Sequence, residues 1–198
     1  MESKNKTNIL YIKNMVCNRC IKVVKEELEK AGIEIKNITL GEVELTKPID
    51  QKKLNEIKKA LEANGFEILE NRKAKIVEKI KNTVISIIYQ NDELLTSNKN
   101  FSSLIEEKIG MDYNYLSYIF SSLESITIEQ FIILQKIERA KELLKYDELT
   151  LSEIAYKLGY KSVQHLSSQF KKVTGFSASE FKKNLLNLRK PIDKVISL

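Results

Sequence analysis

Apolar positions in the first 70 residues fall into short stretches with two different periods. Residues 7–15 and 33–46 are rich in β-branched and aromatic residues and are broken by turn residues, which is typical of strands. Residues 20–32, and the stretch after Pro48, place apolar side chains three or four positions apart, which is typical of amphipathic helices. A last apolar stretch covers 66–70. The predicted order of elements is β-α-β-β-α-β.

From about Arg72 onward the apolar positions follow a helical period. Four of the predicted helices begin with a capping box, in which a Ser or Thr is followed three residues later by Glu or Gln. The four boxes are Ser103–Glu106, Thr127–Gln130, Thr150–Glu153 and Ser177–Glu180. The second part of the chain is therefore predicted to be all α.

The helical part contains an internal repeat. Gly110, Leu116, Phe120 and Phe131 recur as Gly159, Leu166, Phe170 and Phe181, with an offset of 49 residues at the glycine and 50 at the others. Each copy has the pattern of helix, short turn and helix, in which the glycine relieves the turn. The repeat predicts a first helix-turn-helix unit at about 101–123, a connecting helix at about 128–146 and a second unit at about 151–173.

These patterns together predict the fold class. Residues 1–70 are expected to form an α+β, ferredoxin-like domain with the split β-α-β plan. Residues 71–198 are expected to form an all-α domain with tandem helix-turn-helix units.

The net charge of +6 is unevenly distributed along the chain. Residues 91–135 contain two lysines and seven acidic residues, a balance of −5, whereas residues 157–198 contain nine basic and two acidic residues, a balance of +7. A basic block at the end of a helical domain is typical of a surface that binds a polyanion. Charge alone fits a solvated surface about equally well.

Other features argue against whole classes of protein. Residues 1–8 are polar and lack the apolar core of a secretory signal. The longest apolar runs, 84–89 and 131–134, are far shorter than the roughly 18–20 residues of a membrane span. We therefore expect a cytoplasmic protein with no membrane partner. The sequence shows no nucleophile–base set and no phosphate-cradling loop, so we do not expect an enzyme.

The segments KIERAKELL, at 136–144, and LSEIAYKLGYKSVQHLSSQFKKVTGFSASEF, at 151–181, resemble the DNA-binding region of AraC/XylS-family transcription regulators. The resemblance extends over roughly residues 75–184. In that family two helix-turn-helix units flank a connecting helix. The resemblance therefore implies a sequence-specific DNA-binding transcription regulator.

The second helix of such a unit enters the major groove. In the second unit this helix is expected at about 162–173, with Leu166, Phe170 and Val173 facing the core. The resemblance places base-reading residues on the outward face of this helix. The corresponding helix of the first unit, about 112–123, offers Tyr113 and three further outward-facing residues. The base-reading candidates are Val163, Gln164, Ser167 and Ser168 in the second unit and Asn114, Ser117 and Tyr118 in the first. Five lysines are expected to neutralise phosphates: Lys161, Lys171, Lys172, Lys182 and Lys183.

The first unit departs from the pattern of the second. Ser121 and Ser122 stand where the second copy has Lys171 and Lys172. In addition, Glu106 replaces Ala155 and Ser125 replaces Gly175. We therefore expect the second unit to carry most of the DNA affinity.

The only two cysteines, Cys17 and Cys20, lie in the stretch NMVCNRC. Cys17 is expected in the loop after the first strand and Cys20 in the first turn of the first helix. The helix N-terminus and Arg19 would stabilise thiolates there. Soft sulfur ligands select Cu(I) or Zn²⁺, and since two sulfurs cannot complete a tetrahedral zinc site, linear Cu(I) or a site shared by two protomers fits better. Thiol–disulfide chemistry is the weaker alternative, because no proline follows the helix to form an opposing loop.

Met15-x-Cys17-x-x-Cys20 on this frame resembles heavy-metal-associated domains over about residues 8–70. The resemblance implies that Cys17 and Cys20 are metal ligands, that Met15 packs in the core and that Phe66 shields the ion. Asn14 stands where the family usually has glycine. The alternative is a docking module that keeps the fold and no longer binds metal.

The sequence as a whole predicts an AraC-type regulator that binds double-stranded DNA and responds to a soft metal ion. RNA polymerase and a second copy of the chain are further candidate partners. Two alternatives stay open. One is a metal-trafficking protein whose helical half binds a protein, and the other is the same regulator with a non-metal signal.

Overall fold

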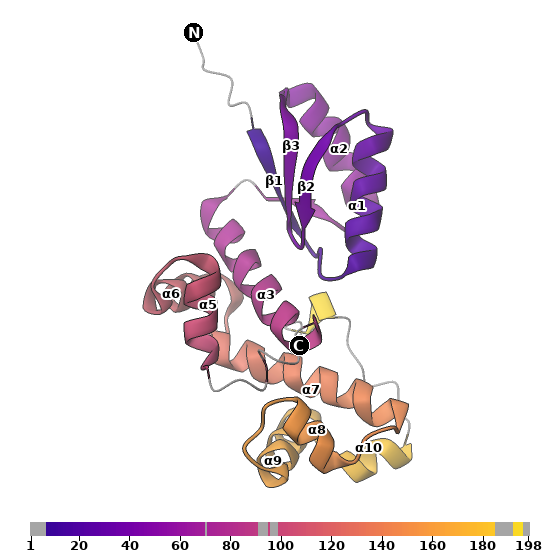
Figure 1. Cartoon of the computed structure of the whole chain (residues 1–198), viewed down its shortest axis with the longest axis vertical. Helices are drawn as coiled ribbons and strands as arrows, with labels where there is room; N and C mark the ends of the chain where they lie inside the picture. Colours follow the sequence, from indigo (N-terminus) through magenta and orange to yellow (C-terminus); the bar gives the residue numbers. More distant parts are fainter. Residues whose placement is uncertain (1–6, 70, 91–94, 96–98, 185–191, 196–198) are drawn as a thin grey trace. The chain divides into compact units, whose positions relative to one another are not determined.

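The computed structural model describes residues 7–69, 71–90, 95, 99–184 and 192–195 (Figure 1). The chain divides into two compact units, Met1–Asn82 and Thr83–Leu198. The division falls inside helix α3 (Arg72–Gln90), whereas the sequence placed a domain boundary at 70/71. Residues 1–6, Glu70 and the basic residues Arg189 and Lys190 lie outside the described ranges. No helix within those ranges is long and apolar enough to cross a membrane.

The first unit is built on a four-stranded sheet. Its elements are β1 (Thr7–Lys13), α1 (Asn18–Lys30), β2 (Ile35–Thr39), β3 (Glu42–Ile49), α2 (Gln51–Ala63) and β4 (Glu67–Ile68). The strand order is β2-β3-β1-β4, and every neighbouring pair is antiparallel. The element order is therefore the predicted one.

The two faces of this sheet have different partners. Successive side chains of a strand point to opposite faces, and Leu10 and Ile12 of β1 are buried in the core with Val24 of α1 and Ile57 of α2. Tyr11 points to the other face. There the Nζ atoms of Lys75 and Lys79, on α3, lie 4.8 and 5.2 Å from the centroid of the Tyr11 ring. The first turns of α3 therefore pack against the sheet as part of this unit.

The second unit is helical, as predicted. Its helices are α5 (Phe101–Ile109), α6 (Tyr113–Glu124), α7 (Ile128–Tyr146), α8 (Leu151–Lys157), α9 (Val163–Thr174) and α10 (Ala178–Asn184), followed by a 3-10 helix, η1 (Ile192–Lys194). Helix α7 contacts α6, α8, α9 and α10 and is the central element of the unit. The pairs α5–α6 and α8–α9 coincide with the two predicted helix-turn-helix units, and α7 with the predicted connecting helix (Figure 1).

Three of the four predicted capping boxes are present. The side-chain oxygens of Thr127, Thr150 and Ser177 each accept a hydrogen bond from the backbone N–H three residues later. The side chain of the Gln or Glu at that later position accepts one from the backbone N–H of the Thr or Ser. The prediction for Ser103–Glu106 is wrong, because α5 begins at Phe101 and Ser103 is its third residue. The Glu106 carboxylate instead accepts a hydrogen bond from the backbone N–H of Tyr113 at 2.7 Å.

Candidate nucleic-acid interface

Helix α9 is held in place by a small apolar face. Leu166 and Phe170 are fully buried, and the Phe170 ring meets the Phe181 ring of α10 edge to face, with centroids 5.5 Å apart. The helix begins after Ser162, whose Oγ accepts the backbone N–H of His165 at 3.2 Å. It ends at Gly175, whose φ of 80° lies in the left-handed region that favours glycine. One side of α9 is therefore anchored and the opposite side faces outward.

The base-reading candidates of α9 lie on this outward side. Gln164 and Ser168 are exposed, while Val163 and Ser167 are half-buried. Glutamine and serine are side chains that hydrogen-bond base edges in a major groove. Val173 was expected in the core, but it is 38% exposed. It lies in the last turn of α9, one residue before the helix ends, so the buried face of α9 ends at Phe170.

The five candidate phosphate ligands are all exposed lysines. Lys161 immediately precedes the N-cap of α9, and Lys171 and Lys172 lie in its last turn. Lysines in a last turn also interact favourably with the negative end of the helix dipole, so these two have a structural role as well. The Lys182 ammonium pairs with the Asp147 carboxylate. Both groups are exposed, and such surface pairs are weak enough for a phosphate to compete.

The first helix-turn-helix unit, α5–α6, presents a different surface. Helix α6 exposes Asn114 and Tyr118, whereas Ser117 is half-buried. Tyr115 is also 49% exposed, and it was missed as a candidate. The repeat offset of 50 residues could have found it, because Tyr115 corresponds to the exposed His165 of α9. The first helix-turn-helix unit therefore presents tyrosines at 115 and 118 where the second has His165 and Ser168, and it lacks counterparts of the two lysines at 171 and 172.

Tyr113, the counterpart of Val163, uses its polar groups in hydrogen bonds within the protein. Its hydroxyl donates a hydrogen bond to the Glu129 carboxylate, and its backbone N–H donates to Glu106. Burial, together with the Glu129 carboxylate, raises the pKa of the Tyr113 hydroxyl far above its ordinary value, so this hydroxyl remains a donor. At the end of α6, Ser125 adopts a φ of 57°. A residue with a side chain is strained there in a way that Gly175 is not.

The two thiols converge at the start of α1. Cys17 is the N-cap residue and Cys20 the third residue of the helix, and their Sγ atoms are 3.4 Å apart. Burial acts to raise the pKa of the Cys17 thiol, but hydrogen bonds from Cys20 and the positive charge of Arg19 outweigh it and lower the pKa. For Cys20, burial and the neighbouring Cys17 thiol raise the pKa.

The loop that carries the thiols is tied to two other segments of the first unit. Asn14 has a φ of 69°, a conformation that asparagine tolerates better than most residues with a side chain. Its Nδ2 donates to the Gly65 carbonyl at 2.9 Å, and its backbone N–H donates to the Glu78 carboxylate on α3 at 3.2 Å. Met15 is fully buried, in line with the core position that the resemblance implied.

The chemistry of the thiol pair fits a soft ion with two ligands. Within the described ranges, no group of three His, Cys, Asp or Glu side chains is arranged to hold a metal. A complete tetrahedral zinc site is therefore not formed by the described residues, whereas a two-coordinate Cu(I) ion needs only the two sulfurs.

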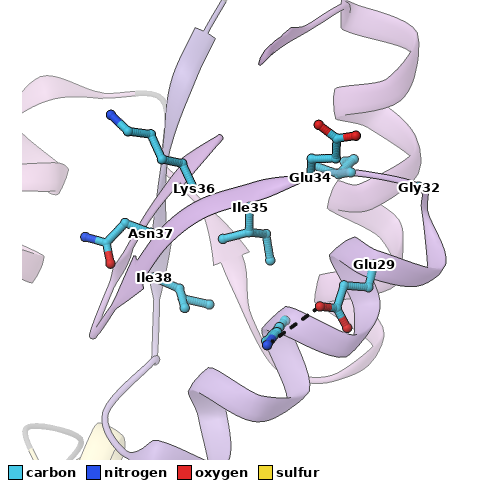
Figure 2. A pocket seen from close by; sticks show the side chains of 9 residues that line it. Glu29, Gly32, Glu34, Ile35, Lys36, Asn37 and Ile38 are labelled. Atoms are coloured by element: carbon cyan, nitrogen blue, oxygen red, sulfur yellow. Dashed lines mark ion pairs between the residues drawn. The ribbon is translucent and has the colours of Figure 1, made fainter. Parts of the chain in front are cut away.

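A groove of about 630 Å³ lies elsewhere on the first unit, between α1 and the edge strand β2 (Figure 2). Lys25 and Glu29 of α1 form an ion pair of 3.8 Å in its wall. Ile35 and Ile38 of β2 are half-buried. The lining contains no cysteine or histidine, so the groove offers no ligand for a soft metal.

Comparison with known proteins locates similarity in the helical part of the chain. Residues 105–184 match a family described as a helix-turn-helix domain, HTH_18. The Msm operon regulatory protein of Streptococcus mutans is 29% identical over 83 residues, 42% of this chain and 30% of that protein. The F1 operon positive regulatory protein of Yersinia pestis is 31% identical over 100 residues, 50% of this chain and 33% of that protein. The chain thus spans about a third of the length of these relatives.

One solved structure also resembles part of this chain. The C-terminal domain of AraT, a response regulator from Geobacillus stearothermophilus, covers 58% of this chain and 88% of its own, with a TM-score of 0.48 and 23% identity. The residues matched by the helix-turn-helix family run from within α5 to the end of α10. Residues 105–184 of this chain are therefore similar to a family of helix-turn-helix domains.

Proposed function

We propose that this protein is a sequence-specific, DNA-binding transcription regulator of the AraC type, in which α9 is the principal recognition helix. The observation that carries the proposal is the two-sided character of α9. Its buried Leu166 and Phe170 fix the helix, while Gln164 and Ser168 face outward. Exposed Lys171 and Lys172 lie at the end of the same helix. Hydrogen-bonding groups flanked by cations suit the base edges and phosphates of a major groove.

Titration of the full chain against a labelled random-sequence duplex tests this proposal. Fluorescence anisotropy at a series of salt concentrations gives the slope of log affinity against log salt. Four or five phosphate contacts predict a slope of roughly −3.5 to −4.5. Selection of bound fragments from random DNA then shows whether one sequence is preferred. A protein that is not retained on duplex DNA at low salt would favour the alternative of a helical half that binds a protein partner.

We further propose that the first unit is a ferredoxin-like sensor whose thiol pair binds Cu(I). The β-α-β-β-α-β order, the strand order β2-β3-β1-β4 and the 3.4 Å separation of the two Sγ atoms support it. The bound ion would supply a positive charge and a fixed link between Cys17 and Cys20. The Asn14–Glu78 hydrogen bond connects this loop to α3, and α3 continues into the second unit.

Anaerobic titration with Cu(I) against a competing chelator tests the metal site. Cys17→Ser is expected to weaken binding by at least about 100-fold, because loss of even an outer-shell partner costs roughly 10- to 100-fold. Met15→Leu is the matched control, and it should bind Cu(I) as the wild type does if Met15 only packs in the core. DNA affinity is then measured with and without Cu(I). A regulator with a non-metal signal would show equal DNA affinity in both states.

A further inference from the structure

A half-buried lysine on the connecting helix lies between the two helix-turn-helix units. The Nζ atom of Lys136, on α7, is 5.1 Å from the centroid of the Phe101 ring and 5.1 Å from the centroid of the Tyr160 ring. Phe101 is the first residue of α5, in the first helix-turn-helix unit. Tyr160 belongs to the turn between α8 and α9, in the second helix-turn-helix unit. One ammonium group therefore contacts an aromatic ring from each unit.

The turn of the second unit also approaches this ammonium closely. Gly159 has a φ of 65°, and a Cβ atom built there would lie 2.5 Å from the carbonyl oxygen of Leu95 and 3.7 Å from the Nζ atom of Lys136. A side chain at this position would force the backbone of Leu95 or the turn to shift. The turn is therefore packed tightly against Leu95 and the connecting helix.

Tyr160 extends this contact to the recognition helix. Its hydroxyl donates a hydrogen bond to Oε1 of Gln169 at 2.9 Å, and its ring and the His165 ring form a T-shaped pair with centroids 5.3 Å apart. Burial raises the pKa of the Tyr160 hydroxyl, so it remains a donor at neutral pH. His165 directly follows Gln164. Tyr160 therefore supports the part of α9 that presents the base-reading candidates.

Placing a cation between these rings costs free energy, because the charged group is partly removed from water; an apolar side chain would not have this cost. Burial lowers the pKa of the Lys136 ammonium to about 8, and the group is still mostly protonated at pH 7. Its attraction to each ring is directional, because the negative potential lies over the ring face. A methionine could fill the same space without fixing the direction of either ring.

We propose that Lys136 is a positioning residue that fixes the orientation of α9 relative to the first helix-turn-helix unit, α5–α6. It thereby sets the spacing between the two DNA segments that the two helix-turn-helix units contact. This inference rests on the proposed function, because it requires both helix-turn-helix units to bind one DNA duplex. The ligand in question is double-stranded DNA, and Lys136 acts on it through Phe101 and Tyr160.

The test compares Lys136→Met and Lys136→Arg with a control, Lys145→Met, which removes an exposed lysine from the same helix. The full chain is assayed on a duplex selected from random DNA, and on a shortened duplex that keeps only the segment footprinted by α9. For Lys136→Met, the ratio of the two affinities is expected to fall by about 5- to 10-fold, or roughly 1–1.4 kcal/mol. Lys136→Arg retains a cation over the rings and should keep the ratio within about 2-fold.

Hydroxyl-radical footprints provide a second measurement that a purely structural role would not change. The wild type and Lys145→Met should protect two segments at one fixed spacing, and Lys136→Met should lose that fixed spacing. Equal ratios and footprints for Lys136→Met and Lys145→Met would overturn the inference while leaving the proposed function intact. A wild-type footprint confined to one segment would overturn it too. Absence of salt-dependent duplex binding by the wild type would overturn the proposed function itself.

A second variant covers the case in which Lys136→Met does not fold, as judged by circular dichroism. Tyr160→Phe keeps the ring beneath Lys136 and removes only the hydroxyl that bonds to Gln169. It is expected to change the affinity ratio in the same direction by about 2- to 5-fold, in line with the loss of one hydrogen bond. An unchanged ratio in Tyr160→Phe would count against the positioning role.

Discussion

Replacing both Lys171 and Lys172 by alanine is expected to lower the affinity for duplex DNA by about 60-fold at 0.1 M salt. Each phosphate contact contributes about 0.9 to the slope of log affinity against log salt, so two contacts contribute about 1.8. Both lysines are exposed in the last turn of α9. The slope measured by fluorescence anisotropy should therefore become shallower by about 1.8, and this change is the sharper of the two readouts.

Two control variants separate phosphate contact from net charge and from position in the repeat. Lys52→Ala with Lys59→Ala removes the same charge from exposed positions of α2 and should leave the slope unchanged. Ser121→Ala with Ser122→Ala alters the repeat-equivalent positions of α6. Their hydroxyls donate to backbone carbonyls of their own helix, at 2.9 and 2.7 Å, and affinity should change by no more than about 2-fold. A slope that stays the same in the Lys171 and Lys172 variant would refute the assignment of α9 as the main DNA-binding helix.

The repeated helices were predictable from the sequence because their signals are local. Thr127 and Thr150 each begin a helix through a bond to a residue three positions away. The apolar spacing of Leu166 and Phe170 identifies the buried face of α9 by periodicity alone. Patterns of this kind operate within one or two helical turns, so the predicted range of about 128–146 agrees with α7.

Contacts between distant segments were not predictable in the same way. Glu106 looked like half of a capping box, but its carboxylate bonds to the backbone of Tyr113 in the next helix. Asn14 and Glu78 are 64 positions apart, and nothing in the sequence near either residue indicates the other. The enclosure of Lys136 depends on Phe101 and Tyr160, which belong to different helix-turn-helix units. Such contacts follow from tertiary packing, which a single sequence encodes only indirectly.

The exposure of Val173 shows the limit of periodicity near a helix end. Its position relative to Phe170 would place it on the buried face of an indefinitely long helix. Helix α9 ends at Thr174, however, and Val173 is 38% exposed. A periodic pattern predicts which side of a helix faces the core, but it does not predict where the neighbouring helices stop covering that side.

The substitution Phe170→Ala is expected to lower the free energy of unfolding by about 3–5 kcal/mol. Phe170 is fully buried and meets Phe181 edge to face, so the variant loses both the burial of the ring and a favourable aromatic contact. Chemical denaturation followed by circular dichroism measures the change, and anisotropy under native conditions measures DNA affinity, which should fall with the folded fraction of α9.

The internal repeat supplies the comparison variant for this prediction. Phe120 occupies the equivalent position in α6 and is equally buried, and the centroid of its ring lies 5.7 Å from that of the Phe131 ring. Phe120→Ala should therefore lower the free energy of unfolding by a similar amount. Leu123→Ala changes a residue that is 49% exposed on α6 and should cost less than about 1 kcal/mol. If Phe170→Ala cost no more than Leu123→Ala, α9 would not be anchored through Phe170. The outward presentation of Gln164 and Ser168 would then lose its structural basis, because it depends on a recognition helix held by its buried side.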